Sequence, residues 1–230
     1  MECLFICNAF RLHLLSLQLS SAVIIKHLRG PFPNTFPRES FAHVLRTFRL
    51  QVMHSNDLKE GQCNSIWSLF ETNMRGMYEA SSFGWDPQAK QKELFHSLSR
   101  FLLVTDTEKS ELVAFTNFRF EVEGGEDLIY CYDLQVSPST QGVGLGKNMM
   151  KELEKIAQSY NMEKIALTVF KANTKAAAFY KAFGFELDLT SPNFLEEEDE
   201  LDPDEVETTD YEILSKGVPP KLAAAWAETS

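Results

Sequence analysis

The hydrophobic and polar positions of this 230-residue chain follow two different periods. Apolar residues recur every third or fourth position from 64 to 80, which indicates an amphipathic helix, whereas they alternate with polar residues from 111 to 123, as in a half-buried strand. We predict helices over 41–45, 64–80, 88–98, 147–160 and 173–182. We predict strands over 47–53, 100–106, 111–123, 128–136, 164–170 and 210–215. Hairpins followed by a strand–helix–strand crossover predict an α+β domain with a mixed sheet.

Turn residues mark several of these boundaries. Asp86-Pro87 is typical of a helix start, Gly124-Gly125 of a tight hairpin, and Gly184 of a helix end. Three prolines between 31 and 37 indicate a linker after the first segment. We therefore expect an extension over 1–45, one domain over 46–216 with an acidic loop at 193–210, and a tail over 217–230.

The net charge of −11 is concentrated in one segment, because residues 196–210 contain ten acidic residues and no Lys or Arg. The rest of the chain is close to neutral, which argues against a nucleic-acid-binding surface. The four cysteines form no C-x-x-C pair, so neither a metal site nor a disulfide framework is indicated. Free thiols fit the cytosol or the nucleus.

The first segment, 3–25, is apolar but is interrupted by Arg11 and His13. It lacks the charged start and the cleavage site of a signal peptide, and it is too broken for a good membrane span. We therefore expect no membrane association and interpret it as a covering helix or an extension.

A glycine-rich turn, Gln141-Gly-Val-Gly-Leu-Gly-Lys147, separates the predicted strand 128–136 from the predicted helix 147–160. Glycines let a backbone approach a ligand closely, and a helix N-terminus attracts anions, so the pattern predicts a pyrophosphate cradle. A dinucleotide site would need G-x-G-x-x-G and a distant acid, and a phosphate loop would need Gly-Lys-Ser/Thr. Neither fits. The spacing Q-x-x-G-x-G is similar to the acetyl-CoA signature of the GNAT acetyltransferases.

From about 64 to 215 the chain resembles the N-terminal acetyltransferase D family, GNAT-fold enzymes that acetylate histone N-termini. The matching stretches are 72–79, 84–85, 118–123, Tyr130-Cys-Tyr-Asp133, 144–147, Leu167-Thr-Val-Phe-Lys-Ala-Asn173 and 211–215. The resemblance implies a GNAT fold of α+β (α/β three-layer) class, with a mixed twisted sheet flanked by helices and acetyl-CoA in the splay between central strands. Residues 1–45 depart from the family, which usually begins with a basic segment.

The resemblance also implies how acetyl-CoA is held. Backbone groups at the end of the strand 128–136 would hold the pantetheine arm, with an N–H near Leu134 stabilising the carbonyl oxygen, and the glycine turn would hold the diphosphate. Phe179 and Tyr180 would pack beside the cofactor, although ordinary core packing explains them equally well. The expected cofactor-binding residues are Leu134, Gln135, Val136, Gln141, Gly142, Val143, Gly144, Leu145, Gly146, Lys147, Asn173, Phe179 and Tyr180. No metal is expected.

Three residues of the strand are candidates for the chemistry. An N-terminal amine has a pKa of about 7.7–8.0, so a weak base suffices to deprotonate it. Asp133 is the candidate base, acting through a water. Alternation along the strand places Tyr130 and Tyr132 on one face, opposite Asp133. One tyrosine would bind substrate and the other would protonate the leaving thiolate, and the sequence does not decide between them; packing is the alternative for both.

Substrate recognition is expected from two groups of side chains. Glu121 and Glu123 share one face of their strand and suit an arginine, such as the third residue of Ser-Gly-Arg-Gly histone N-termini; a solvated face is the alternative. By the resemblance, further residues would enclose the small N-terminal end. The expected substrate-binding residues are Tyr78, Trp85, Glu121, Val122, Glu123, Tyr132, Thr168, Thr190 and Tyr211.

Together these features favour an enzyme that acetylates the N-terminal amine of histones by direct attack in a ternary complex. Two alternatives remain: an acetyltransferase for another amine, either lysine or a small molecule, and a cofactor-binding scaffold without turnover. The expected partners are histone tails and, for nascent chains, the ribosome, in the cytoplasm and nucleus. The acidic loop is either a solvated insertion or a surface that attracts basic tails.

Overall fold

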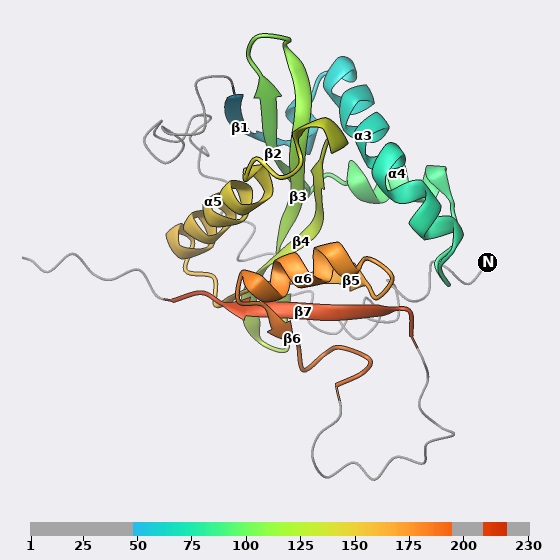
Figure 1. Ribbon diagram of the computed structural model, residues 1–230. Helices are drawn as coiled ribbons and strands as arrows, with labels where there is room; N and C mark the ends of the chain where they lie inside the picture. The colour runs from blue at the N-terminus through green and yellow to red at the C-terminus, as the bar shows by residue number, and fades with distance from the viewer. Residues whose placement is uncertain (1–47, 195–208, 220–230) are drawn as a thin grey trace, which may run out of the picture.

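The computed structural model describes residues 48–194 and 209–219, which form one seven-stranded mixed sheet with helices on both faces (Figure 1). The strands are β1 (Phe48–His54), β2 (Arg100–Asp106), β3 (Glu111–Glu123), β4 (Glu126–Val136), β5 (Lys164–Phe170), β6 (Glu186–Leu187) and β7 (Tyr211–Gly217). The helices are α3 (Glu60–Glu79), α4 (Pro87–Leu94), α5 (Leu145–Ser159) and α6 (Thr174–Ala182), with short 3-10 turns η2 (Ser55–Asp57) and η3 (Pro138–Thr140).

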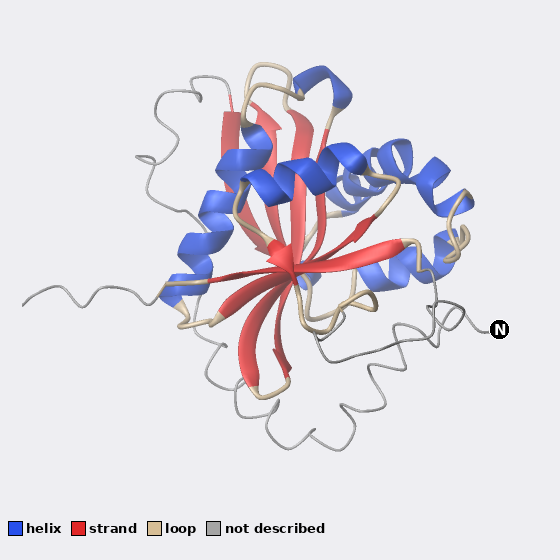
Figure 2. Ribbon diagram, turned by 60° about the horizontal axis from the view of Figure 1, so that its bottom comes forward, coloured by secondary structure: helices blue, strands red, loops and turns tan. Residues whose placement is uncertain are grey.

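The strand order is β1-β2-β3-β4-β5-β7-β6, and the strands fan out from the middle of the sheet (Figure 2). The pair β4–β5 is parallel and is connected through α5, whereas every other neighbouring pair is antiparallel. The connections β2–β3 and β3–β4 are short turns, whereas α3 and α4 lie between the antiparallel strands β1 and β2, and the parallel pair needs the helical crossover. The predicted order of hairpins and crossover is therefore confirmed.

Two apolar clusters fix the helices to the two faces of the sheet. On one face, Phe101, Leu103 and Phe115 pack against Ile66 and Phe70 of α3. On the other face, the inward side chains of the same strands pack against α5 and α6. These buried residues include Leu102, Val104, Ala114, Met149, Met150, Leu153, Ile156 and Tyr180. Alternate residues of β2 and β3 thus serve opposite layers, as the pleat of a strand requires.

Most predicted boundaries agree with the structure. The strands predicted over 100–106, 111–123 and 164–170 are confirmed in full, and Gly184 follows α6 at a positive φ of 92°. Asp86 caps α4 by accepting from the backbone N–H groups of Gln88 and Ala89. The largest differences from the prediction are that α3 starts earlier, at Glu60, that α4 ends earlier, at Leu94, and that β6 was not predicted.

The early start of α3 has a local cause. The backbone N–H of Lys59 donates to the side chain of Gln62, which satisfies a donor at the helix start and extends the helix beyond its apolar stripe. The helix predicted over 41–45, the proline linker and most of the acidic loop lie outside the described residues. Within 48–194 and 209–219, no helix combines the length and the apolar character needed to cross a bilayer.

Candidate functional site

The two parallel strands at the centre of the sheet separate partway along their length. Their pairing runs from Leu128 opposite Lys164 to Cys131 opposite Leu167 and ends there. β4 continues for five more residues beside β3, whereas β5 continues beside β7. The two strands therefore leave a splay between them, and it begins directly after Cys131.

A β-bulge lies at the same point. Asn117 of β3 pairs with Asp133, but the next residue, Phe118, pairs with Cys131, so Tyr132 is an extra residue in β4. A bulge shifts the alternation of side chains by one residue. Asp133 consequently faces α4, where it meets Lys90, on the same face as Tyr132.

This geometry corrects one sequence-based prediction. We predicted Asp133 on the face opposite Tyr130 and Tyr132, because uninterrupted alternation would put it there. The bulge instead brings all three side chains to the face covered by α3 and α4. Past the bulge, Leu134 lies on the other face, close to α5. The three candidate catalytic residues are thus gathered at the opening of the splay.

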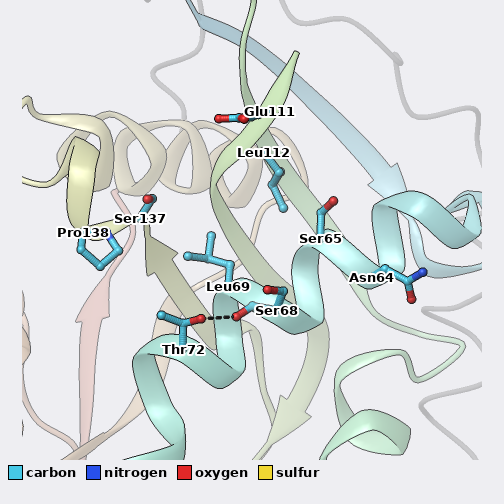
Figure 3. Close-up of a pocket in the computed structure, with 9 residues that line it drawn as sticks. All are labelled: Asn64, Ser65, Ser68, Leu69, Thr72, Glu111, Leu112, Ser137 and Pro138. Carbon is cyan, nitrogen blue, oxygen red and sulfur yellow. Dashed lines mark hydrogen bonds between the residues drawn. The ribbon is translucent and has the colours of Figure 1, made fainter. Parts of the chain in front are cut away.

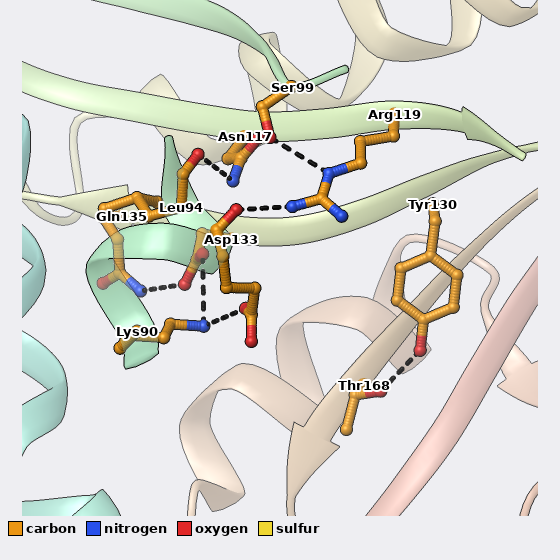
Figure 4. Close-up of polar contacts among 10 residues, drawn as sticks. Lys90, Leu94, Ser99, Asn117, Arg119, Tyr130, Asp133, Gln135 and Thr168 are labelled. Atoms are coloured by element: carbon orange, nitrogen blue, oxygen red, sulfur yellow. Dashed lines mark hydrogen bonds and ion pairs between the residues drawn. The ribbon is translucent and has the colours of Figure 1, made fainter. Parts of the chain in front are cut away.

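The two tyrosines have different partners. Their ring centroids are 5.0 Å apart. The hydroxyl of Tyr130 lies 2.6 Å from Oγ1 of Thr168 on β5, which bridges the two strands where they separate (Figure 4). The hydroxyl of Tyr132 donates to Glu121 at 3.2 Å, and the guanidinium of Arg119 lies 4.0 Å above its ring. Burial, and after it the Glu121 carboxylate, hold the pKa of Tyr132 well above its usual range, so its hydroxyl is neutral and keeps its proton in the hydrogen bond to Glu121.

Asp133 has the properties of a base. Its side chain is buried, and burial raises its pKa from 3.8 to about 6, against the opposing effect of Lys90. Its Oδ1 accepts a long hydrogen bond of 3.5 Å from Gln135, whereas its Oδ2 lies 3.7 Å from the Lys90 ammonium and accepts no hydrogen bond within the described residues. A carboxylate with this pKa is ionised at pH 7 and still basic enough to take a proton.

A neighbouring side chain suggests where a water would bind. Asn117 lies directly across from Asp133, and its Nδ2 donates to the backbone carbonyl of Leu94, while its buried Oδ1 accepts no hydrogen bond from the described part of the chain. Side chains directly opposite on neighbouring strands have Cβ atoms about 5 Å apart. Two buried acceptors at this spacing favour a water that donates to both.

The expected enclosing residues form one aromatic cluster. Tyr78 at the end of α3 contacts the ring of Phe170 on β5 at 5.1 Å and that of Trp85 at 6.0 Å. Phe83, which was not predicted, joins Phe170 to Tyr211 on β7, with centroid distances of 5.5 and 5.3 Å. Burial, which outweighs the nearby Lys90, raises the pKa of Tyr78 to about 12. The cluster therefore connects α3 to the far strand of the splay.

The predicted acidic pair lies beside this opening. Glu121 accepts the hydrogen bond from Tyr132, and Glu123 follows two residues later on the same face of β3, with Val122 between them. Burial raises the pKa of Glu123 from 4.5 to about 7, and the Glu121 carboxylate raises it further, whereas Lys164 acts against both. A cation bound beside Glu123 would lower this pKa again, because an opposite charge favours the ionised form.

Thr190 has a structural partner. Its backbone N–H and hydroxyl both donate to Asp188, at 2.9 and 2.6 Å, and Asp188 also pairs with Lys164. Asp188 is close enough to Glu123 to raise its pKa. Thr190 therefore fixes a turn near the acidic pair, and direct contact with a substrate stays a prediction.

Two of the three glycines in the turn adopt the positive-φ backbone conformation that favours glycine. Gly142 and Gly144 have positive φ angles of 81° and 89°, which residues with a Cβ rarely adopt, whereas Gly146 lies within the helix. A Cβ on Gly146 would point into the protein, 3.5 Å from Phe179 and 3.6 Å from Leu134, which is ordinary contact. The need for glycine is thus confined to the two positions before α5.

The start of α5 fits an anionic group. Gly144 is its N-cap and provides no side-chain acceptor, and the first bond of the turn runs from the N–H of Asn148 to the carbonyl of Gly144. Within the described residues, the N–H groups of Leu145, Gly146 and Lys147 have no acceptor, and Lys147 is exposed. Free N–H groups at a helix start bind phosphate oxygens well.

Other expected cofactor residues have structural partners of their own. The carbonyl of Val136 accepts from Gln141 at 3.2 Å and from Asn73 at 3.1 Å, which fastens the turn to α3. The side chain of Asn173 caps α6 by accepting from the N–H of Ala176. Contact of these groups with a cofactor therefore stays a prediction, and the carbonyl of Val136 is not available for it.

Four of the expected cofactor residues differ in exposure: Phe179, Tyr180, Leu134 and Val143. Tyr180 is buried, with its ring 5.2 Å from that of Phe179, and its hydroxyl is near enough to Cys131 and Asp133 for both to raise its pKa beyond the effect of burial. Phe179 and Leu134 are partly buried against the core. Val143 is exposed on the turn. The buried tyrosine thus reaches the closed end of the splay from α6.

A separate surface pocket of about 480 Å³ lies between α3, the start of β3 and the end of β4 (Figure 3). Its lining comprises Asn64, Ser65, Ser68, Leu69, Thr72, Glu111, Leu112, Ser137 and Pro138. It contains none of the candidate catalytic side chains, and its hydroxyls on α3 bond within the helix, as in the bond from Thr72 to the carbonyl of Ser68. The pocket therefore lies apart from the candidate catalytic residues.

Four polar residues of the site were missed from the sequence. Each of them lies on the face covered by α4 and is either buried or in contact with a buried polar group. They are Lys90, Glu93, Asn117 and Arg119. Asn117 and Arg119 follow the apolar Phe115 at every second position of a predicted strand, so polar residues on an inward face were a usable signal. Lys90 gave no such signal, because it lies in a largely polar helix.

The model of the Acetyltransferase (GNAT) family matches residues 64–185. Among solved structures, the NatC complex bound to Gag peptide and CoA is 14% identical, with 75% of this chain and 99% of that chain covered and a TM-score of 0.54. Arabidopsis thaliana NAA60 in complex with a bisubstrate analogue is 12% identical, with 75% and 100% covered and a TM-score of 0.52.

A spermidine N-acetyltransferase from Vibrio cholerae, in complex with CoA and spermine, is 18% identical, with 74% of this chain and 95% of that chain covered and a TM-score of 0.50. At these identities the structures establish the fold and not the acceptor, which differs among them. The seven-stranded mixed sheet with its splayed central pair is the GNAT fold. Because the family model covers more than half of the sequence, this chain belongs to the GNAT family of acetyltransferases.

Proposed function

We propose that this protein is an Nα-acetyltransferase that moves the acetyl group of acetyl-CoA to the free amine of chains beginning Ser-Gly-Arg-Gly, as certain histones do. The observation that supports this most is the grouping of Asp133, Tyr130 and Tyr132 on one face at the start of the splay. Acetyl-CoA supplies the activated acetyl group. The protein supplies a base, neutral proton donors and an enclosed place for a small chain end.

The proton transfers follow from the contacts of these side chains. Asp133, through a water shared with Asn117, accepts the proton that the amine loses. Tyr130, which already bonds to Thr168 across the splay, and Tyr132 are the candidates to protonate the leaving thiolate. Both hydroxyls are held by a hydrogen bond, so each is oriented before substrate binds.

The aromatic cluster favours an N-terminal amine over a lysine side chain. Tyr78, Trp85 and Tyr211 belong to one connected set of rings, which suits a chain that ends at the site more than one that continues past it. The expected partners are therefore histone tails and, for nascent chains, the ribosome, in the cytoplasm and nucleus. The acidic residues 196–210 would attract such basic tails.

Thiol release should separate this proposal from its alternatives. We expect release from acetyl-CoA with a Ser-Gly-Arg-Gly peptide and none with the same peptide acetylated at its N-terminus. Release with an N-acetylated peptide that carries a lysine would instead identify a side-chain enzyme, and release with spermidine only would identify a small-amine enzyme. Coenzyme A binding without turnover of any acceptor would identify a scaffold.

The glycine turn gives a matched pair of variants for cofactor binding. Gly144→Ala should weaken coenzyme A binding about tenfold or lower stability by about 1–2 kcal/mol, because a residue with a Cβ is strained at this positive φ. Gly146→Ala should bind coenzyme A as the native protein does, because its Cβ would meet only Phe179 and Leu134. Calorimetric titration with coenzyme A and thermal unfolding measure both effects. Equal losses in the two variants would contradict this account of the turn.

A further inference from the structure

The helix α4 is attached to the sheet mainly by polar groups. Only two of its side chains are buried, Lys90 and Leu94. From β3, Asn117 donates to the carbonyl of Leu94 at 3.2 Å, and Arg119 donates to the carbonyl of Glu93 and, at 3.0 Å, to the hydroxyl of Ser99. These bonds satisfy carbonyls at the helix end and fix α4 over the bulge. Lys90, one turn earlier, is thereby held against β4.

The ammonium of Lys90 lies among two carboxylates and two aromatic rings. It is 2.6 Å from Glu93 and 3.7 Å from Oδ2 of Asp133 (Figure 4). It also lies 5.0 Å from the ring of Phe70 and 5.3 Å from that of Tyr78. Its side chain is only 8% exposed. Burial lowers the pKa of Lys90, but the two carboxylates, Asp133 first, outweigh it and hold this pKa well above its usual range, so the amine is charged near pH 7.

Stability alone does not account for a charge in this place. Desolvating an ammonium costs several kcal/mol, and the ion pairs that compensate for it typically do no better than a well-packed apolar side chain. The charge of Lys90 is better explained by its effect on Asp133, the candidate base at the opening of the splay.

We propose that Lys90 is a positioning residue for the acetyl transfer, whose fixed ammonium keeps the buried Asp133 carboxylate ionised at neutral pH while Glu93 limits that effect. The inference rests on the proposed function, since it assigns Lys90 to the same base. It makes α4 part of the catalytic apparatus, although no side chain of that helix touches the reacting atoms.

The charged and titratable groups around Asp133 come from every element packed against it. They are Lys90 and Glu93 on α4, Tyr78 on α3, Arg119 on β3, Cys131 and Tyr132 on β4, and Tyr180 on α6. The phenols and the thiol have raised pKa values and are neutral near pH 7. Burial is the largest influence on the pKa of Asp133, and beyond burial the charge of Asp133 depends on the balance between Lys90, which lowers this pKa, and Glu93, which raises it.

This balance predicts that replacing Lys90 and replacing Glu93 change the pKa of Asp133 in opposite directions. Lys90→Met should raise the pKa of Asp133, and Glu93→Gln should lower it, each by about one unit, which is at the lower end of the effect of a charge within 4–6 Å. Both variants remove the charge–charge attraction of the same Lys90–Glu93 pair. If that contact were only structural, the two variants would change the pH profile in the same direction or not at all.

The experiment measures the acid limb of kcat against pH and, independently, the titration of the Asp133 carboxyl by carbon-13 NMR, assigned by its loss in Asp133→Asn. We expect the limb and the carboxyl titration to move to higher pH in Lys90→Met, to lower pH in Glu93→Gln, and to stay within about 0.3 unit of the native value in the control Lys90→Arg. Unmoved titrations in folded variants, or shifts of the same sign, would overturn the inference.

The two readouts separate this inference from the proposed function. The carboxyl titration needs no turnover, so opposite shifts in a protein that fails to acetylate any peptide would support the control of Asp133 by Lys90 and refute the proposed reaction. Turnover with unshifted titrations would support the proposed reaction and refute the control of Asp133 by Lys90. If Lys90→Met does not fold, Glu93→Gln decides, because the Glu93 side chain is 33% exposed and its backbone carbonyl, which holds Arg119, is unchanged.

Discussion

Asp133→Asn should lower kcat about 10²- to 10³-fold and leave the Kd for coenzyme A unchanged, which is the scale of general-base catalysis. The amide keeps the size of the side chain but cannot accept the proton of the amine. The bonds from Asn117 and Arg119 to the carbonyls of Leu94 and Glu93 remain to hold α4 in place. Steady-state turnover of a Ser-Gly-Arg-Gly peptide and calorimetric titration with coenzyme A test the two halves of the expectation.

The pH dependence adds a second test of the same assignment. Burial raises the pKa of Asp133 to about 6, so the native kcat should fall as the pH drops through 6 and the carboxylate becomes protonated. The variant should lack this limb. Glu152→Gln is the matched control, because Glu152 is an equally buried carboxylate, paired with Lys155 on α5, outside the site. Undiminished turnover of Asp133→Asn between pH 7 and 9 would remove Asp133 from the mechanism.

Much of the fold could be predicted because local patterns and tertiary packing agree. β5 is buried and bounded by polar turns, so its limits at Lys164 and Phe170 follow from the sequence. The start of α4 at Asp86-Pro87 is set by a side-chain cap and a fixed φ, which are local effects. The two-residue strand β6 could not be predicted, because its pairing with β7 depends on a partner more than 25 residues away.

The arrangement of the site was less predictable, for a physical reason. The Tyr130-Cys-Tyr-Asp133 run predicted candidate side chains that the structure brings to one face, but the bulge at Tyr132 depends on the register between β3 and β4 and has no residue signature of its own. One extra residue reversed the predicted face of Asp133. Lys90 was missed because a lysine in a polar helix is normally solvated, and only the docking of α4 shows that this one is buried.

Replacing both carboxylates of the acidic pair, Glu121→Gln with Glu123→Gln, should raise KM for a Ser-Gly-Arg-Gly peptide about 10- to 100-fold, the scale of one or two charge-assisted hydrogen bonds. KM for a peptide with alanine third should change little. Glu121 also accepts the hydrogen bond of Tyr132, so kcat should fall for both peptides. Steady-state kinetics of the two peptides side by side therefore separates recognition of the arginine from the loss of support for Tyr132.

The preference for arginine should itself depend on pH. The pKa of Glu123 is raised to about 7 by burial and by Glu121, so in the free protein this carboxyl is partly protonated at neutral pH and loses its proton as the pH rises. Binding of a cation favours the ionised form, so the ratio of kcat/KM for the arginine peptide to that for the alanine peptide should rise between pH 6 and 8 and be flat in the double variant. Taking the ratio cancels the titration of Asp133 and of the peptide amine, which both substrates share. A ratio that stays flat in the native protein would mean that the arginine does not meet Glu123, and the acidic pair would then be a solvated face of β3.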